Sequence, residues 1–282
     1  MALRIVDSHV HFWNPPQLDY SWLADLPALN QPILPDHVPL EGPGWVSDAL
    51  VFVQAGSLAS EGLAEAAWVS ELAQQDARIQ GIVAFAPLES PDAAQTLEAL
   101  QAYPLVKGIR RLIQSEGSGF CLQRAFVESV QALPRYGYSF DLCIRHHQLL
   151  DVIALVGQCP DVSFVLDHIG KPDIKAGLLD PWYEHIKALA QFPNVSCKLS
   201  GLVTESDVDL WQPMHLTPYI NHVLEAFGPA RVMFGSDSPV LRLAHLTYEG
   251  WMKVALAALQ SLSESEIQQI FGDNARAFYR LN

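Results

Sequence analysis

The sequence predicts an α/β protein with a (β/α)8 barrel, the TIM-barrel fold, formed by one domain over residues 1–282. Three observations support this prediction. The chain has 282 residues, a length at which such barrels form a single domain. Eight apolar, β-rich runs recur along the chain, and segments with helical periodicity separate several of them. Strands that alternate with helices pair in parallel, so eight repeats favour a closed barrel.

The predicted strands are almost continuously apolar, which is typical of parallel strands buried on both faces. In chain order they are Arg4–Trp13, Ala49–Ala55, Gln80–Pro87, Val106–Ile113, Ser139–Ile144, Val162–His168, Val195–Leu202 and Arg231–Gly235. The amphipathic segments predicted as helices are Leu63–Asp76, Pro91–Ala102, Gln123–Leu133, Leu149–Gly157, Trp182–Gln191 and Thr217–Phe227. A doubly wound open sheet is the alternative fold. It is disfavoured because no Gly-x-Gly-x-x-Gly sequence follows an early strand.

Two segments interrupt this alternation. Residues Asn14–Pro43 are rich in proline and aromatic residues, which predicts a long excursion after the first strand that is ordered by packing. Near the C-terminus, Ser263-Glu264-Ser265-Glu266 has the pattern of a capping box and begins a predicted closing helix, with a break expected near Gly272. The apolar positions of that helix are Ile267, Ile270, Phe271, Ala275 and Phe278.

Composition excludes several classes of partner. The formal net charge is −14, and such a surface repels phosphate backbones and anionic lipids, so we expect no nucleic-acid or membrane partner. The first apolar run is interrupted by Asp7 and His9 and does not resemble a signal peptide. Four scattered cysteines predict reduced core thiols and a cytoplasmic location. They are Cys121, Cys143, Cys159 and Cys197. A homodimer is among the expected assemblies.

The first predicted strand carries a His-x-His motif, His9-Val10-His11. Side chains alternate along a strand, so Asp7, His9 and His11 share one face. Two imidazoles on one face near the end of a strand form half of a metal site. The alternative interpretation is a surface strand with two hydrogen-bonded histidines.

Other predicted strands also end in polar residues, and in a barrel of this kind the chemistry lies at these carboxyl ends. The candidate functional residues at or near these strand ends are Gln54, Lys107, Arg110, Arg111, Arg145, His146, His147, His168, Lys198 and Asp237. Arg110 and Arg111 point to opposite faces, so at most one enters the barrel mouth. Each residue has a simpler interpretation, such as a turn at Asp237 or a core histidine at His168. The joint pattern indicates groups that bind metals, transfer protons or bind oxyanions.

Taken together, these motifs resemble the amidohydrolase superfamily, in particular its branch of sugar lactonases of the L-fuconolactonase and L-rhamnonolactonase type. The matching segments are His9-Val10-His11, Leu166–Pro172, Cys197–Leu202, Phe234–Pro239 and Gly272–Arg276. The resemblance implies a barrel that hydrolyses an ester or amide. It also implies that His9, His11, His168 and Asp237 flank the reacting centre and are the ligands of a divalent metal ion.

One departure from that pattern concerns the number of ions. Binuclear members use a carbamylated lysine on a middle strand, and the predicted strand Ser139–Ile144 contains no lysine. The resemblance therefore implies a single ion, for which Zn²⁺ is the expected choice. Some lactone hydrolases of this superfamily work without a metal, so the ion is not a strict requirement of the chemistry.

The motifs and the resemblance together lead to the hypothesis that the protein hydrolyses a small lactone. Asp237 deprotonates the attacking water, and His168 helps to polarise the carbonyl and stabilise the oxyanion. Asp7 is a candidate partner that fixes the tautomer of His9. The predicted substrate-binding residues are Trp13, Gln54, Arg110, Lys171 and Lys198. The alternatives are a 2-pyrone dicarboxylate lactonase, a decarboxylase of the same superfamily and a barrel that only binds a ligand.

Overall fold

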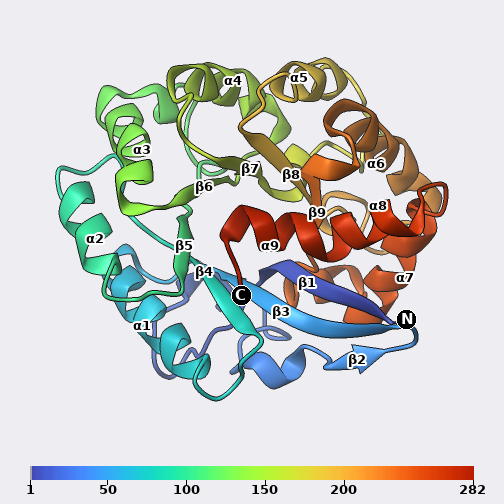
Figure 1. Ribbon diagram of the computed structural model, residues 1–282, viewed down its shortest axis with the longest axis horizontal. Helices are drawn as coiled ribbons and strands as arrows, with labels where there is room; N and C mark the ends of the chain where they lie inside the picture. The colour runs from blue at the N-terminus through green and yellow to red at the C-terminus, as the bar shows by residue number, and fades with distance from the viewer. Residues whose placement is uncertain (1) are drawn as a thin grey trace.

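The computed structural model describes residues 2–282 and shows a barrel of eight parallel strands surrounded by helices (Figure 1). The strands follow one another around the barrel in sequence order, and each pairs in parallel with the next. They are β1 (Leu3–Val10), β3 (Trp45–Val53), β4 (Ile79–Ala84), β5 (Val106–Ile109), β6 (Ser139–Leu142), β7 (Phe164–Leu166), β8 (Val195–Leu199) and β9 (Val232–Phe234). The predicted fold class and all eight predicted strands are confirmed.

The barrel closes between its first and last strands, just beyond their carboxyl ends. The amide of Asp237 donates to the carbonyl of His9 at 2.8 Å, and the amide of His11 donates to the carbonyl of Ser238 at 2.8 Å. Below these bonds, the hydroxyl of Ser8 donates to the carbonyl of Phe234 at 2.6 Å. The closure therefore brings the histidine motif of β1 beside the polar segment that follows β9.

The outer ring consists of helices whose apolar faces pack on the barrel (Figure 1). The six predicted helices are confirmed as α1 (Gly62–Leu72), α2 (Ala93–Leu100), α3 (Arg124–Tyr136), α4 (Leu149–Gln158), α5 (Trp182–Leu189) and α6 (Pro213–Phe227), and α7 (Tyr248–Ala258) completes the ring. In α3, the buried residues Phe126, Val130 and Leu133 recur at helical spacing. Among residues 2–282, no helix has both the length and the apolar character needed to cross a bilayer.

The excursion after β1 is ordered and packed, as predicted. Its residues Tyr20, Leu23 and Leu29 are buried. Arg78 also holds it by donating to the carbonyls of Pro35, Val38 and Pro39 at 3.0–3.1 Å. At its end, the short strand β2 (Glu41–Gly42) pairs antiparallel with β3, a pairing that the sequence did not predict.

The closing helix lies across the amino-terminal end of the barrel (Figure 1). It begins with the predicted capping box at Ser263 and comprises α8 (Glu264–Gln268) and α9 (Asn274–Tyr279). The break expected near Gly272 is absent, because a π-helical turn over Gln269–Asp273 connects the two helices. From this helix the hydroxyl of Tyr279 donates to Asp141 Oδ2 at 2.7 Å, so the helix also contacts the polar interior of the barrel.

Candidate active site

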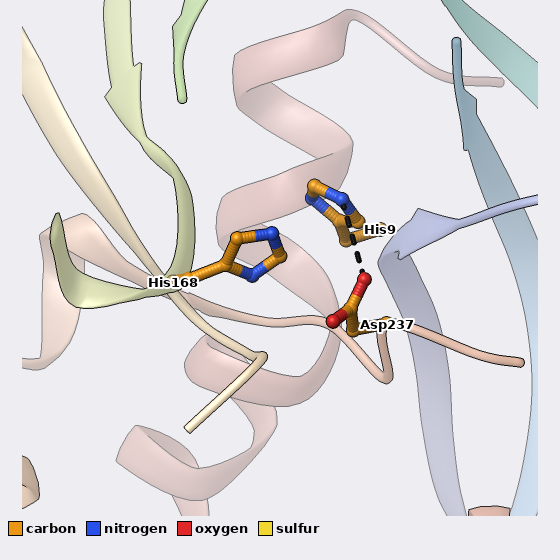
Figure 2. A group of neighbouring side chains, drawn as sticks. All are labelled: His9, His168 and Asp237. Carbon is orange, nitrogen blue, oxygen red and sulfur yellow. Dashed lines mark ion pairs between the residues drawn. The ribbon is translucent and has the colours of Figure 1, made fainter. Parts of the chain in front are cut away.

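Three of the predicted site residues meet at the carboxyl ends of the strands (Figure 2). His9 comes from β1, His168 follows β7, and Asp237 follows β9. One ligand atom of each lies within 4.8 Å of the others, and all three side chains are buried. The predicted convergence of these residues is therefore present in the fold.

Local backbone conformation directs two of these side chains. His168 and Asp237 both adopt the left-handed conformation, with φ of 53° and 57°. This conformation is uncommon for residues other than glycine and is concentrated at functional sites, where surrounding contacts maintain it. Here the Nδ1 atom of His168 lies 2.9 Å from the hydroxyl of Ser200, and the amide of Asp237 is bonded to His9.

Two glycines make room for the imidazoles. A Cβ atom on Gly201 would lie 2.4 Å from His168 Nδ1, and a Cβ atom on Gly235 would lie 2.7 Å from the Cβ of His9. No larger residue fits at either position without moving a site histidine. The glycines in the motifs Lys198-Leu199-Ser200-Gly201 and Phe234-Gly235-Ser236-Asp237 therefore have a steric role in the site.

The tautomer of His11 follows from its hydrogen bond. Its Nδ1 atom lies 2.7 Å from the carbonyl of Val53, which can only accept, so Nδ1 carries the hydrogen. In the neutral imidazole, Nε2 then has the free lone pair. This atom lies 3.2 Å from His9 Nε2 and 3.4 Å from Asp237 Oδ1.

Three charged side chains surround the imidazole of His9. Arg110 Nη1 lies 3.3 Å from His9 Nε2 and can only donate, so the contact requires a lone pair on Nε2. On the other side of the ring, Nδ1 lies 3.3 Å from both Asp167 Oδ1 and Lys198 Nζ, and of these two only the carboxylate can accept a hydrogen from Nδ1. Burial lowers the pKa of His9 well below its ordinary 6.5, so the ring is neutral.

The arrangement fits a divalent metal ion. His9 Nε2, His11 Nε2 and Asp237 Oδ1 lie 3.2, 3.4 and 3.8 Å apart, with lone pairs on both imidazole nitrogens. A zinc ion bound about 2.0–2.2 Å from two ligands in a tetrahedral site keeps these ligands roughly 3.4 Å apart. Lone pairs this close repel one another unless a cation lies among them. His168 lies near enough to be a further ligand.

A second group of potential ligands is less suited to a metal ion. Cys143, Asp167 and His168 also have ligand atoms within 4.8 Å of one another. Burial raises the pKa of the Cys143 thiol, which disfavours the thiolate form that binds metals. Asp167 already forms ion pairs with Lys198 and Arg110, both at 3.1 Å. The four cysteines are all unpaired and buried, as predicted.

Beneath the histidines lies a chain of alternating buried charges. Lys198 Nζ contacts Asp141 at 2.5 Å and Asp167 at 3.1 Å, and Asp167 contacts Arg110 at 3.1 Å. Although burial alone would raise the pKa of Asp167, Lys198 and His9 outweigh it and hold the pKa well below 3.8. Burial raises the pKa of Asp141 to about 6. The chain is fully ion-paired, which is the condition under which buried charges are tolerated.

A cavity of about 400 Å³ opens above the site. Of the predicted residues, it is lined by His11, Arg110, Lys171, His168 and Asp237. The other lining residues are Trp22, Ala55, Gly56, Leu112, Gln114, Ser115, Cys143, Thr204 and Val240. The candidate base and a candidate substrate pocket therefore adjoin.

Three predicted substrate-binding residues do not line this cavity. Lys198 is fully buried in the charge chain. Trp13 is also fully buried and donates its indole hydrogen to the carbonyl of Leu29 at 2.9 Å. Gln54 is 2 % exposed, and its Oε1 atom accepts from the amide of Gly56 at 2.7 Å. The structure thus places all three in supporting positions behind the cavity wall.

The geometry corrects one further expectation, about Asp7, and agrees with another, about the two adjacent arginines. Asp7 does not contact the imidazole of His9; it accepts from the backbone amides of His9 at 3.1 Å and Ser236 at 2.8 Å, and Asp167 is the imidazole partner. Arg111 points away from the mouth and pairs with Glu89 and Glu116, so only one of the two adjacent arginines enters, as predicted.

Sequence reasoning missed Trp22 as a cavity residue. The residue is 38 % exposed, and its indole donates to the carbonyl of Ala55 at 2.8 Å and packs edge-on against Trp13. The aromatic richness of the excursion was the available signal, but it did not distinguish Trp13 from Trp22. No sequence signal pointed to Gln114 or Thr204.

Comparisons with known proteins cover almost the whole chain. A family model described as amidohydrolase matches residues 6–281. The L-fucono-1,5-lactonase of Burkholderia multivorans is 35 % identical over 295 residues, which cover 99 % of this chain and 97 % of that protein. The L-rhamnono-gamma-lactonase of Scheffersomyces stipitis is 29 % identical over 234 residues, covering 72 % and 69 % of the two chains. A crystal structure of a Burkholderia multivorans amidohydrolase with bound zinc aligns with a TM-score of 0.87 and 32 % identity over 99 % of both chains.

The steric role of Gly235 can be tested by adding one methyl group. We expect Gly235→Ala to lower the free energy of unfolding by about 1–3 kcal/mol, because the new Cβ overlaps His9 Cβ in a packed interior. Gly117→Ala is the matched control, since its added Cβ meets nothing within 4 Å. Chemical denaturation measures both. Equal stability of the two variants would contradict the steric role.

Proposed function

Since the chain belongs to the amidohydrolase family, we propose that it is a hydrolase of lactone ester bonds that opens a sugar aldonolactone, such as L-fucono-1,5-lactone or L-rhamnono-γ-lactone, to the hydroxy acid. The observation that carries this proposal is the position of Asp237. Its carboxylate lines the cavity beside three imidazoles, on a scaffold that matches named sugar lactonases along nearly its whole length.

Asp237 is the proposed general base. Burial by itself raises the pKa of this carboxyl, but the neighbouring His168 and His11 outweigh it and hold the pKa below the ordinary 3.8. The group is therefore ionised at neutral pH and accepts a proton from water. Oδ1 faces His9 and His11, and the second oxygen points away from His9 (Figure 2). So weak a base suffices where nearby cations lower the pKa of the attacking water.

The electrophilic side of the site has two components in this chain. His168 lines the cavity, and burial lowers its pKa to about 4, so it is neutral at physiological pH. Arg110 lines the same cavity and contributes a permanent positive charge. Both lie where they can stabilise the oxyanion that forms when water adds to the carbonyl.

His9, His11, His168 and Asp237 would hold a divalent metal ion, for which Zn²⁺ is the proposed identity. Such an ion supplies Lewis-acid polarisation of the carbonyl and lowers the pKa of water. A lactone is an activated ester and needs less polarisation of its carbonyl than an amide does. The positive charge of Arg110 adds to the polarisation that the ion would supply.

The cavity wall suits a polyhydroxylated ring. Lys171 Nζ donates to Gln114 Oε1 at 2.6 Å and lies 3.7 Å from Glu205, so an array of donors and acceptors borders the mouth. Trp22 adds an exposed aromatic surface, which we propose as the platform for the apolar C–H face of the sugar ring. Trp22 thus takes the place of Trp13, which the sequence predicted as a substrate-binding residue.

The alternative functions are less well supported. A 2-pyrone dicarboxylate requires cationic groups for two carboxylates, yet Arg111 pairs with two glutamates and Arg145 is half exposed beside Glu205. Arg110 and Lys171 line the described cavity, but Arg110 is paired with Asp167, and Lys171 is bonded to Gln114 and lies 3.7 Å from Glu205. A decarboxylase would release carbon dioxide and is distinguished by assaying that product.

The proposed activity is tested by a pH-indicator screen of aldonolactones, with and without a chelator. We expect acid release from L-fucono-1,5-lactone or L-rhamnono-γ-lactone above the spontaneous rate, and no release of carbon dioxide. Absence of turnover with every aldonolactone would overturn the proposal. The chelator arm separates the contribution of the ion from that of Arg110.

Replacing the base should abolish most of this activity. We expect Asp237→Asn to lower kcat by about 10²- to 10⁴-fold, because an amide cannot accept the proton of the attacking water. The initial rate on the active aldonolactone measures the effect. Asp25→Asn, at an exposed position, is the control and should retain the full rate. A kcat for Asp237→Asn within a few-fold of the original would exclude this role.

The proposed platform predicts a defect in binding rather than in chemistry. Trp22→Ala should raise KM for the sugar lactone about tenfold with kcat nearly unchanged, because the apolar ring contact is lost. Trp22→Phe, which keeps an aromatic face, should restore most of the affinity. A simple aliphatic lactone without hydroxyl groups serves as the comparison substrate. An equal KM increase for both lactones would argue against a specific sugar contact.

A further inference from the structure

Arg110 is a buried, fixed cation inside the proposed metal site. Its side chain is 4 % exposed. Nη1 donates to Asp167 Oδ2 at 3.1 Å, and Nη2 donates to the carbonyl of Gln54 at 2.5 Å. Held by these two acceptors, Nη1 also reaches His9 Nε2 at 3.3 Å. Arg110 thus contacts the nitrogen that faces His11 and Asp237.

His9 has a single lone pair to offer at this position. A neutral imidazole carries its hydrogen on one nitrogen and its lone pair on the other. The contact with Arg110 requires that lone pair on Nε2, which places the hydrogen on Nδ1, 3.3 Å from Asp167 Oδ1 and from Lys198 Nζ. The same lone pair cannot bind an N–H group of Arg110 and a metal ion at once.

Charge reinforces this conflict. The guanidinium is permanently protonated, buried and in direct contact with His9 Nε2 at 3.3 Å. A divalent cation among His9, His11 and Asp237 would therefore face a fixed positive charge at short range. Asp167 compensates the charge of Arg110 only in part, because it is shared with Lys198.

We propose that Arg110 and a divalent metal ion compete for the Nε2 lone pair of His9, so that Arg110 sets the metal affinity of the site. In the ion-free protein the guanidinium occupies this lone pair and provides the positive charge of the site. Binding of an ion breaks the contact between Arg110 and His9. The inference rests on the proposed function in one respect, the role of His9 as a metal ligand.

The test measures zinc affinity directly, by competition with a chromophoric chelator, and needs no activity assay. Arg110→Met should bind zinc about ten- to a hundredfold more tightly than the original protein, because a charge-assisted hydrogen bond no longer has to be broken. Arg110→Lys keeps the charge, but its ammonium cannot reproduce the three contacts of the guanidinium. It should therefore also bind zinc more tightly, by a smaller factor. Circular dichroism confirms that the variants are folded.

Lys171→Met distinguishes competition from a general field effect. Lys171 lines the same cavity and has the same charge, but its ammonium is bonded to Gln114. We expect its removal to change the zinc affinity less than threefold. Arg111→Met, at the adjacent position outside the mouth, should have no effect.

The outcomes separate the two proposals. Unchanged or weaker zinc binding by both Arg110 variants, beside measurable binding by the original protein, overturns the competition. Equal tightening in Arg110→Met and Lys171→Met reduces it to a field effect and also overturns it. Absence of zinc binding in the original protein and in all variants would show that His9 is not a metal ligand, and it would also overturn the competition. The lactonase proposal would then be tested by the substrate screen alone.

Discussion

The carboxylate of Asp167 is the group on which the site depends. It binds residues from three different strands: Lys198 of β8, Arg110 beyond β5 and the imidazole of His9 on β1. Through these contacts it holds the guanidinium in place and lies 3.3 Å from Nδ1 of His9. Removal of Asp167 would leave the buried Arg110 without an ion pair and Lys198 paired with Asp141 alone, so we expect it to disturb both folding and chemistry.

The polar interior of the barrel thus has two layers with different tasks. The lower layer, Asp141, Lys198 and Asp167, is fully buried, and Tyr279 of the closing helix completes it. The upper layer, formed by the histidines and Asp237, borders the cavity. Buried ion pairs contribute little net stability, because desolvation of the charges opposes their attraction. We infer that the lower layer orients the upper one.

Much of this architecture could be predicted from the sequence. Eight buried parallel strands leave long apolar runs that no amphipathic helix imitates, so their number and order were predicted correctly. His9, His11, His168 and Asp237 were identified because several strands end in groups able to bind metals or transfer protons.

The positions that were not predicted depend on how far each side chain lies below the mouth of the barrel. The alternation of side chains along a strand does not indicate this distance. Lys198 shares the inward face of its strand with residues nearer the mouth, yet it lies one layer below the cavity. Trp13 and Trp22 differ in exposure only because the excursion folds back and covers the first and not the second. Asp167, which contacts the imidazole of His9, follows β7 and is brought to β1 only by the closure of the barrel.

The proposed metal site places three lone-pair donors at the ends of β1 and β9 around one cation. Crystals soaked in zinc allow a direct test of this site by anomalous diffraction at the zinc edge. We expect one peak bonded to His9 Nε2, His11 Nε2 and Asp237, with the contact between Arg110 and His9 broken. A peak on Cys143, or zinc bound while Arg110 still contacts His9, would contradict it.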